Sequence, residues 1–166
     1  LANKDEQLRI IGNLPYNIST PLLFHLLGST HCIEDMHFML QKEVVDRMCA
    51  EPGSKKYGRL SVMIQYYCEA ELVFDVPPES FDPIPKVMSA IVRLMPYKKP
   101  PVEIDDIKKL NKVVTTAFSQ RRKTLRNSLK KLITEDQIIA LDINPTLRAE
   151  SISLAEFARL SHLIEL

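Results

Sequence analysis

The chain has 166 residues, of which 45% are hydrophobic and 26% are charged, and its formal net charge is +1. This length and composition predict one ordinary globular domain, or a small domain with a helical appendage. No apolar run approaches the roughly 18 residues that span a bilayer, so we expect no membrane association. The N-terminal residues lack the basic and apolar regions of a secretory signal, which favours a cytoplasmic protein.

The cysteines and histidines show no pattern typical of a disulfide framework or a metal site. Three cysteines are widely spaced, with no C-x-x-C pair, and the four histidines show no H-E-x-x-H spacing. We therefore expect reduced thiols and no metal. The residues are Cys32, Cys49, Cys68, His25, His31, His37 and His162.

The charges are unevenly distributed along the chain. Residues 108–131 contain nine Lys or Arg and no Asp or Glu, whereas residues 132–166 contain six acidic residues and two arginines. Such a cationic band suits a polyanionic partner better than a small solute.

The first half of the chain predicts alternating strands and helices. Residues 8–13 form a short apolar run before a turn, as in a buried strand. Thr20 and Pro21 then predict a helix start, with an apolar stripe ending near Gly28. A second strand over residues 36–40 and a helix over residues 42–50 repeat the unit.

The next segments predict a helix over residues 57–67 and two strands, over residues 70–76 and 89–94. The proline-rich loop from Pro77 to Lys86 is too short for a helical crossover, so the two strands should form an antiparallel hairpin. The expected sheet is mostly parallel with this hairpin at its end.

Residues 97–101 have linker composition and predict a boundary between domains spanning residues 1–97 and 98–166. Helices are expected over residues 107–118, 122–132, 134–141 and 153–164. The last two should begin with the capping boxes Thr134/Gln137 and Ser153/Glu156.

The tetrapeptide Asn13, Leu14, Pro15 and Tyr16 follows the first predicted strand, where ligands bind in α/β sheets. One group that such a loop suits is the exocyclic amine of adenine. This amine is a weak nucleophile, so a catalyst must orient it and does not need a strong base to deprotonate it. An Asn side-chain oxygen and a backbone carbonyl can accept its two hydrogens, while an aromatic ring stacks on the base. The alternative is a simple turn after a strand.

Phe81 lies in a loop between rigid prolines, where an exposed aromatic ring is costly without a use. It could stack on the other face of a flipped base. Alternatively, it is a core residue that packs under the loop.

The basic segment of residues 119–131 is a second candidate site. On a helix, Arg122, Arg126 and Lys130 would share one face, with leucines on the other and no acidic residue available for i,i+4 pairing. This favours contact with RNA phosphates over an ordinary solvated face.

Five segments in order resemble motifs of the small-subunit ribosomal RNA adenine dimethyltransferases, the kasugamycin-sensitivity methyltransferases. They are IIGNLPYNISTPLLF, LQKEVVDRM, YGRLSV, FDPIPKVMSAIVRL and AFSQRRKTLRNSL. The resemblance implies an α/β fold: the C-terminal part of a Rossmann-like class I methyltransferase sheet, followed by a small all-α RNA-binding domain. The implied activity is dimethylation of two adjacent adenines near the 3′ end of small-subunit ribosomal RNA, with S-adenosylmethionine as donor and the small ribosomal subunit as partner.

The resemblance also implies residue roles. Asn13, Leu14, Pro15 and Tyr16 correspond to the adenine-binding catalytic motif, with Asn13 also beside S-adenosylmethionine, and Phe81 corresponds to the residue that stacks on the target base. The expected RNA-binding residues are Arg121, Arg122, Lys123, Arg126 and Lys130.

The family's glycine-rich donor loop has no counterpart here, because the four glycines form no G-x-G. We therefore interpret the chain as a C-terminal fragment that is inactive alone, with an uncovered sheet edge available for self-association. Two other functions stay open: a macrolide-resistance methyltransferase acting on large-subunit RNA, and a non-catalytic RNA-binding assembly factor.

Overall fold

The computed structural model describes residues 7–15 and 17–166. Packing divides the chain into two compact units, Leu1–Cys49 with Tyr67–Lys99, and Ala50–Tyr66 with Pro100–Leu166. We call them the sheet unit and the helical unit. One division falls between Lys99 and Pro100, within the predicted linker, but the sequence did not indicate that residues 50–66 pack with the helical unit.

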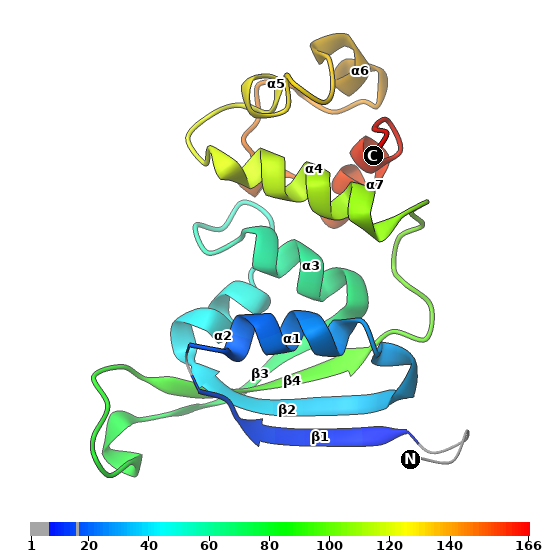
Figure 1. The fold of residues 1–166 in the computed structure, drawn as a ribbon. Helices are drawn as coiled ribbons and strands as arrows, with labels where there is room; N and C mark the ends of the chain where they lie inside the picture. Colours follow the sequence, from blue (N-terminus) through cyan, green and yellow to red (C-terminus); the bar gives the residue numbers. More distant parts are fainter. Residues whose placement is uncertain (1–6, 16) are drawn as a thin grey trace. The chain divides into compact units, whose positions relative to one another are not determined.

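The sheet unit is built on four strands in the order β1-β2-β4-β3 (Figure 1). β1 (Leu8–Asn13) pairs in parallel with β2 (Ile33–Gln41). β4 (Ser89–Pro96) is antiparallel both to β2 and to β3 (Cys68–Val76). The expected α/β fold with an antiparallel final hairpin is confirmed, and one of the three described strand pairs is parallel.

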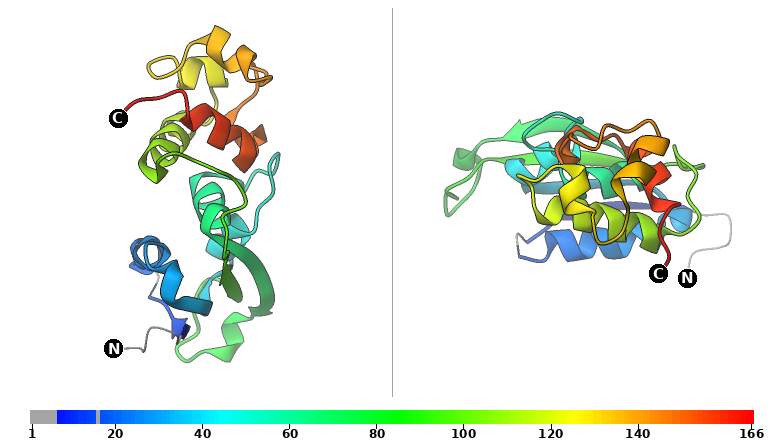
Figure 2. Two further views of the ribbon diagram at one scale, coloured as in Figure 1. Left: turned by 90° about the vertical axis from the view of Figure 1, so that its right-hand side faces the viewer. Right: turned by 90° about the horizontal axis from the view of Figure 1, so that it is seen from above.

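One face of this sheet is covered by helices α1 (Ser19–Leu27) and α2 (Lys42–Met48), as Figures 1 and 2 show. Leu23, Leu27, Val45 and Met48 are buried there. Beneath them the centre of the sheet is apolar, because alternate residues of β2 face the same side. Met36, Phe38 and Leu40 are buried in β2 and pair with Leu94, Val92 and Ala90 of β4.

β1 is less buried than its apolar sequence predicts. It has one neighbour, β2, among the strands that the structure describes, and the Ile11 side chain is 82% exposed. The expectation of a buried strand is therefore wrong for this structure, since the Ile11 face is exposed and no other described strand pairs with the outer edge. Self-association through that edge stays a prediction.

A buried carboxylate ties β1 to the centre of the sheet. The Asp35 side chain of β2 is only 3% exposed and lies 3.0 Å from Arg9 Nη2 of β1 and 3.5 Å from Arg93 Nη2 of β4. A buried charge is tolerated when it is paired in this way. The Arg9 contact therefore supplements the hydrogen bonds that hold this edge strand.

Two helix starts in the first half differ from the sequence prediction. α1 begins at Ser19, with Ile18 at the cap position and no side-chain cap bond, so the expected cap at Thr20 is wrong. α3 (Arg59–Tyr67) begins two residues after the predicted position. Short 3-10 turns occupy η1 (Thr30–Cys32), η2 (Pro78–Ser80) and η3 (Ala149–Ser151).

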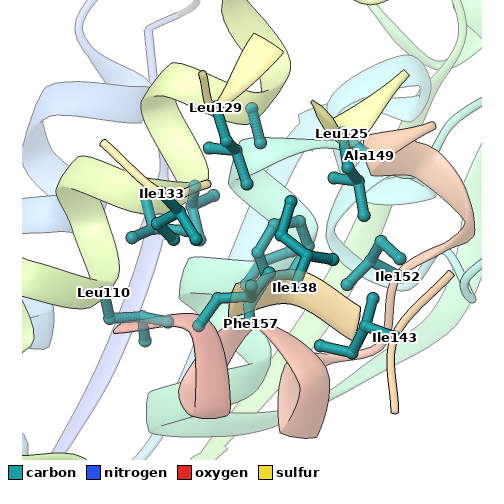
Figure 3. Close-up of a cluster of buried hydrophobic side chains, with 14 of the residues drawn as sticks. Leu110, Leu125, Leu129, Ile133, Ile138, Ile143, Ala149, Ile152 and Phe157 are labelled. Atoms are coloured by element: carbon teal, nitrogen blue, oxygen red, sulfur yellow. The ribbon is translucent and has the colours of Figure 1, made fainter. Parts of the chain in front are cut away.

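The helical unit packs α3 with α4 (Ile107–Ser119), α6 (Glu135–Ala140) and α7 (Leu154–Ser161) around one apolar core (Figure 3). Leu110, Ile138 and Phe157 are fully buried in it. Both predicted capping boxes, at Thr134 and at Ser153, are confirmed. No helix in the described ranges has the length and apolarity needed to cross a bilayer.

The predicted helix over residues 122–132 is wrong, because only α5 (Leu125–Ser128) forms there. The amides of Leu125 and Arg126 donate to the carbonyls of Leu147 and Pro145, so they are satisfied by a distant loop rather than by a preceding helical turn. The chain turns again after Leu129. Consequently Arg122, Arg126 and Lys130 do not share the face of one helix.

The Ser153 cap should contribute measurably to stability. Its hydroxyl accepts from the Glu156 amide at 3.3 Å, so Ser153→Ala is expected to lower the free energy of unfolding by about 1 kcal/mol. Ser151→Ala is the matched control, because Ser151 is exposed and has no cap bond. Urea unfolding of both variants measures the difference, and equal losses would contradict a stabilising role for the cap.

Candidate active site

The end of β1 is held against the end of β2. Asn13 is the last residue of β1, and the Leu14 amide donates to the Met39 carbonyl at 3.2 Å. The Leu14 side chain is 7% exposed and anchors the loop from inside. The Pro15 carbonyl accepts from the Ile18 amide at 3.2 Å, which turns the chain into α1.

The loop of residues 77–88 leaves the sheet at the same edge. Ser89, at the start of β4, pairs with Gln41 at the end of β2 and with Val76 at the end of β3. The Lys42 amide donates to the Met88 carbonyl at 2.9 Å, which fixes the far end of the loop. The loop projects beyond the strands in both Figure 1 and the right view of Figure 2.

Lys42 reinforces this edge with its side chain. Its Nζ lies 2.8 Å from Asp75 of β3 and 3.4 Å from Asp46 of α2. The hydrogen bond to Asp75 raises the pKa of Lys42, so the amine stays charged. We assign it a structural role in joining α2 to the end of β3.

A pocket of about 250 Å³ lies between the two loops. Asn13 and Pro15 come from the end of β1, Met39 comes from β2, and the remaining lining residues come from the loop and the start of β4. The full lining is Asn13, Pro15, Met39, Phe81, Asp82, Pro83, Pro85 and Ser89. Two motifs separated by more than sixty residues in the sequence therefore meet at one site.

The sequence-predicted catalytic residues are distributed unequally around this pocket. Asn13, Pro15 and Phe81 line it, whereas Leu14 is buried beneath the loop and contributes its backbone. Tyr16 lies outside the described residues. Met39 and Ser89 were not predicted from the sequence, although strand register places both at this edge.

The pocket has the chemistry of a site for a flat, polar ring. The half-buried Phe81 offers an aromatic face, and the prolines make the walls rigid. The exposed Asn13 offers an amide oxygen that can accept a hydrogen bond from an amine. Within the described chain, no group of three or more His, Cys, Asp or Glu is arranged to hold a metal ion.

The structure changes the interpretation of the basic segment. Arg126 lies 3.3 Å from Glu135, and Arg121 lies 3.2 Å from Glu150, so two of the arginines have acidic partners although the segment itself contains no acidic residue for i,i+4 pairing. Both acidic partners lie outside the segment, at sequence separations larger than the i,i+4 spacing. Arg122, Lys123 and Lys130 are exposed, and RNA contact by the five predicted residues stays a prediction.

Comparison with known proteins agrees with this fold. The chain matches the family described as "Ribosomal RNA adenine dimethylase" over residues 1–166, and it belongs to that family.

Two curated relatives carry the name "Ribosomal RNA small subunit methyltransferase A". The protein from Erwinia tasmaniensis is 59% identical over 159 residues, covering 96% of this chain and 58% of the relative. The protein from Saccharophagus degradans is 61% identical over 162 residues, covering 98% of this chain and 60% of the relative. The chain thus spans about three fifths of the length of these relatives.

Two solved structures share the fold. A dimethyladenosine transferase from Plasmodium falciparum matches with a TM-score of 0.74 and 25% identity, over 92% of this chain and 64% of that protein. The 23S rRNA methyltransferase ErmE matches with a TM-score of 0.73 and 23% identity, over 96% of this chain and 66% of that protein. The second match shows the fold alone.

Phe81 can be tested directly as a pocket wall or a core residue. If it lines the pocket, Phe81→Ala should lower the free energy of unfolding by less than about 1 kcal/mol, whereas Phe38→Ala, in the core of the same unit, should cost about 3 to 5 kcal/mol. Urea denaturation measures both. A loss at Phe81 as large as that at Phe38 would support the core interpretation instead.

Proposed function

We propose that this chain provides the target-binding part of an RNA adenine methyltransferase. In this proposal, the complete protein uses S-adenosylmethionine to dimethylate the exocyclic amines of two adjacent adenines near the 3′ end of small-subunit ribosomal RNA, in the cytoplasm, during ribosome assembly. The observation that carries the proposal is that Asn13, Pro15 and Phe81 line one pocket of about 250 Å³. The names of the relatives support the substrate class.

The adenine is taken out of its stack and enters the pocket with one face against the Phe81 ring. Stacking on Phe81 offsets part of the free energy lost when the base leaves its stack, because base–aromatic stacking contributes about 1 to 3 kcal/mol per base in single-stranded complexes. The rigid walls formed by Pro83 and Pro85 limit the orientations that the ring can take.

Asn13 and the Leu14 backbone orient the amine. The Pro15 carbonyl is already occupied by the Ile18 amide, so the Asn13 side-chain oxygen and the Leu14 carbonyl are the acceptors we assign to the two amine hydrogens. Holding both hydrogens directs the nitrogen lone pair out of the ring plane and favours the positive charge that develops on nitrogen.

S-adenosylmethionine, when bound, supplies a methyl group carried on a sulfonium. The donor would supply this methyl group to the nitrogen that the Asn13 oxygen and the Leu14 carbonyl orient, and the methylated nitrogen would then lose one proton to water. By resemblance to the family, Asn13 also corresponds to a residue that lies beside S-adenosylmethionine. Of the donor site, however, the 166 residues supply little else, since the four glycines form no G-x-G turn to cradle the nucleoside.

The partner we propose is the small ribosomal subunit. The exposed cations of residues 121–131 provide the electrostatic attraction that a phosphate backbone requires. Binding and chemistry are then divided, because the cations contribute affinity while the pocket at the end of β1 selects the base.

Asn13→Ala tests the catalytic assignment. In a chain extended to the length of the relatives, this substitution should reduce methyl transfer at least about 100-fold, because it removes an acceptor that orients the amine. Asn17→Ala is the matched control, since Asn17 is also exposed but lies outside the pocket lining. Mass spectrometry of the RNA measures dimethyladenosine. A near-normal level in Asn13→Ala would reject the assignment.

A second prediction concerns the donor. The chain of 166 residues alone should bind S-adenosylmethionine far more weakly than the extended chain and should transfer no methyl group, because its sequence has no G-x-G turn to hold the donor nucleoside. Titration calorimetry of the two chains makes the comparison. Equal affinities would mean that the donor site lies within residues assigned here to RNA.

A further inference from the structure

A second basic loop lies beside the turn that follows α4. Residues 51–58 precede α3 and contain the exposed lysines Lys55 and Lys56. The basic turn of residues 120–124 follows α4 and contains Arg121, Arg122 and Lys123. Both segments belong to the helical unit, although they are separated by more than sixty residues in the sequence.

Glu150 and Arg121 join these two segments. The Gly53 amide donates to the Glu150 carbonyl at 2.6 Å, and Arg121 Nε donates to the Glu150 carboxylate at 3.2 Å. Arg121 Nη2 also donates to the Lys55 carbonyl. One arginine and one glutamate therefore connect the loop before α3, the turn after α4, and η3.

Aromatic packing anchors both segments to the core. Tyr57 directly follows Lys55 and Lys56 in the sequence and is 1% exposed. Its ring packs edge-on against Phe118, with 6.2 Å between the ring centroids. Phe118 in turn lies 5.7 Å from Phe157, which Figure 3 shows in the core. Within the loop, Gly53 has φ of 88°, a conformation that suits glycine. The backbone that carries Lys55 and Lys56 is thus held against the core of the helical unit.

This arrangement separates two roles among the cations. The Arg121 guanidinium already bonds Glu150 and Lys55, so its role is to position the loop. Lys55, Arg122 and Lys123 are exposed and form no ion pair within the described part of the chain. Cations carried on neighbouring segments repel one another, and a polyanion relieves that repulsion.

We propose that Lys55, Lys56, Arg122 and Lys123 form one composite surface that binds the phosphate backbone of ribosomal RNA, positioned by Arg121 and Glu150. The inference rests on the proposed function, which supplies the RNA, and adds residues 51–58 to its binding surface. RNA is favoured over an anionic membrane because residues 53–56 and 120–124 contain no large apolar side chain, whereas segments that bind bilayers usually insert such side chains.

The lysines are tested by a charge-matched comparison. Lys55→Gln with Lys56→Gln should weaken binding of this chain to small-subunit ribosomal RNA roughly tenfold and lower the slope of log affinity against log salt by about 1 to 2 units, since each lost phosphate contact lowers it by roughly 0.7 to 0.9. Lys108→Gln with Lys109→Gln removes the same charge at the opposite end of α4 and should have a smaller effect. Equal effects of the two pairs would overturn the surface.

Glu150 tests the positioning role, because charge and position predict opposite results. Removing a carboxylate from a basic region should strengthen RNA binding if only net charge matters. If Glu150 positions the surface, Glu150→Ala should weaken binding and lower the salt slope, although no cation is lost. Glu150→Gln keeps an acceptor for Arg121 and should bind more tightly than Glu150→Ala. If Glu150→Ala binds RNA more tightly than the unsubstituted chain, the positioning role is wrong.

Filter binding with small-subunit ribosomal RNA, and flotation with phosphatidylserine vesicles, complete the experiment. Circular dichroism of each variant checks that the helical unit stays folded. If the unsubstituted chain binds RNA and only the lysine comparison fails, the composite surface is wrong and the proposed function stands. If the unsubstituted chain binds the vesicles and not RNA, both the surface and the RNA partner of the proposed function are wrong.

Discussion

The placement of β4 between β2 and β3, antiparallel to both, is the constraint on which the candidate site depends. It puts the start of β4 opposite the end of β2, so the loop of residues 77–88 emerges where β1 and β2 end. A parallel β4 would deliver its preceding loop to the other edge of the sheet. The pairing of Ser89 with Gln41 therefore brings Phe81 to the pocket that Asn13 lines.

Sequence patterns were sufficient where the structure is decided locally. The strands, the hairpin and the two capping boxes all follow from residues within a few positions of one another. The candidate site could be predicted in part for the same reason, because Asn13 and Phe81 each lie in a recognisable loop. Their meeting depends on the order of the strands, and Met39 and Ser89 enter the site only through register.

The basic segment could not be predicted in the same way, because distant residues determine its structure. The carbonyls of Pro145 and Leu147 accept the amides that would have continued a helix, and Glu135 and Glu150 pair with two of the arginines. A helical-wheel argument considers only neighbours in the sequence. It therefore overestimated the length of the helix and the number of unpaired cations, while it missed the lysines of residues 51–58.

The two units divide the work of recognition in this account. We propose that the sheet unit selects a base through its small pocket, and that the helical unit attracts the RNA backbone through its exposed cations. Affinity from phosphate contacts is independent of sequence, so the helical unit alone cannot select an adenine. In the proposed function, base selectivity is therefore assigned to the pocket at the end of β1.

We propose that this pocket receives the target adenine, and a photochemical crosslink tests that role most directly. Small-subunit ribosomal RNA carrying 8-azidoadenosine at the two target positions would be bound to a chain extended to the length of the relatives, irradiated and digested. Crosslinked peptides are expected from residues 13–15 or 81–85. Crosslinks confined to the helical unit, with none in those two segments, would contradict it.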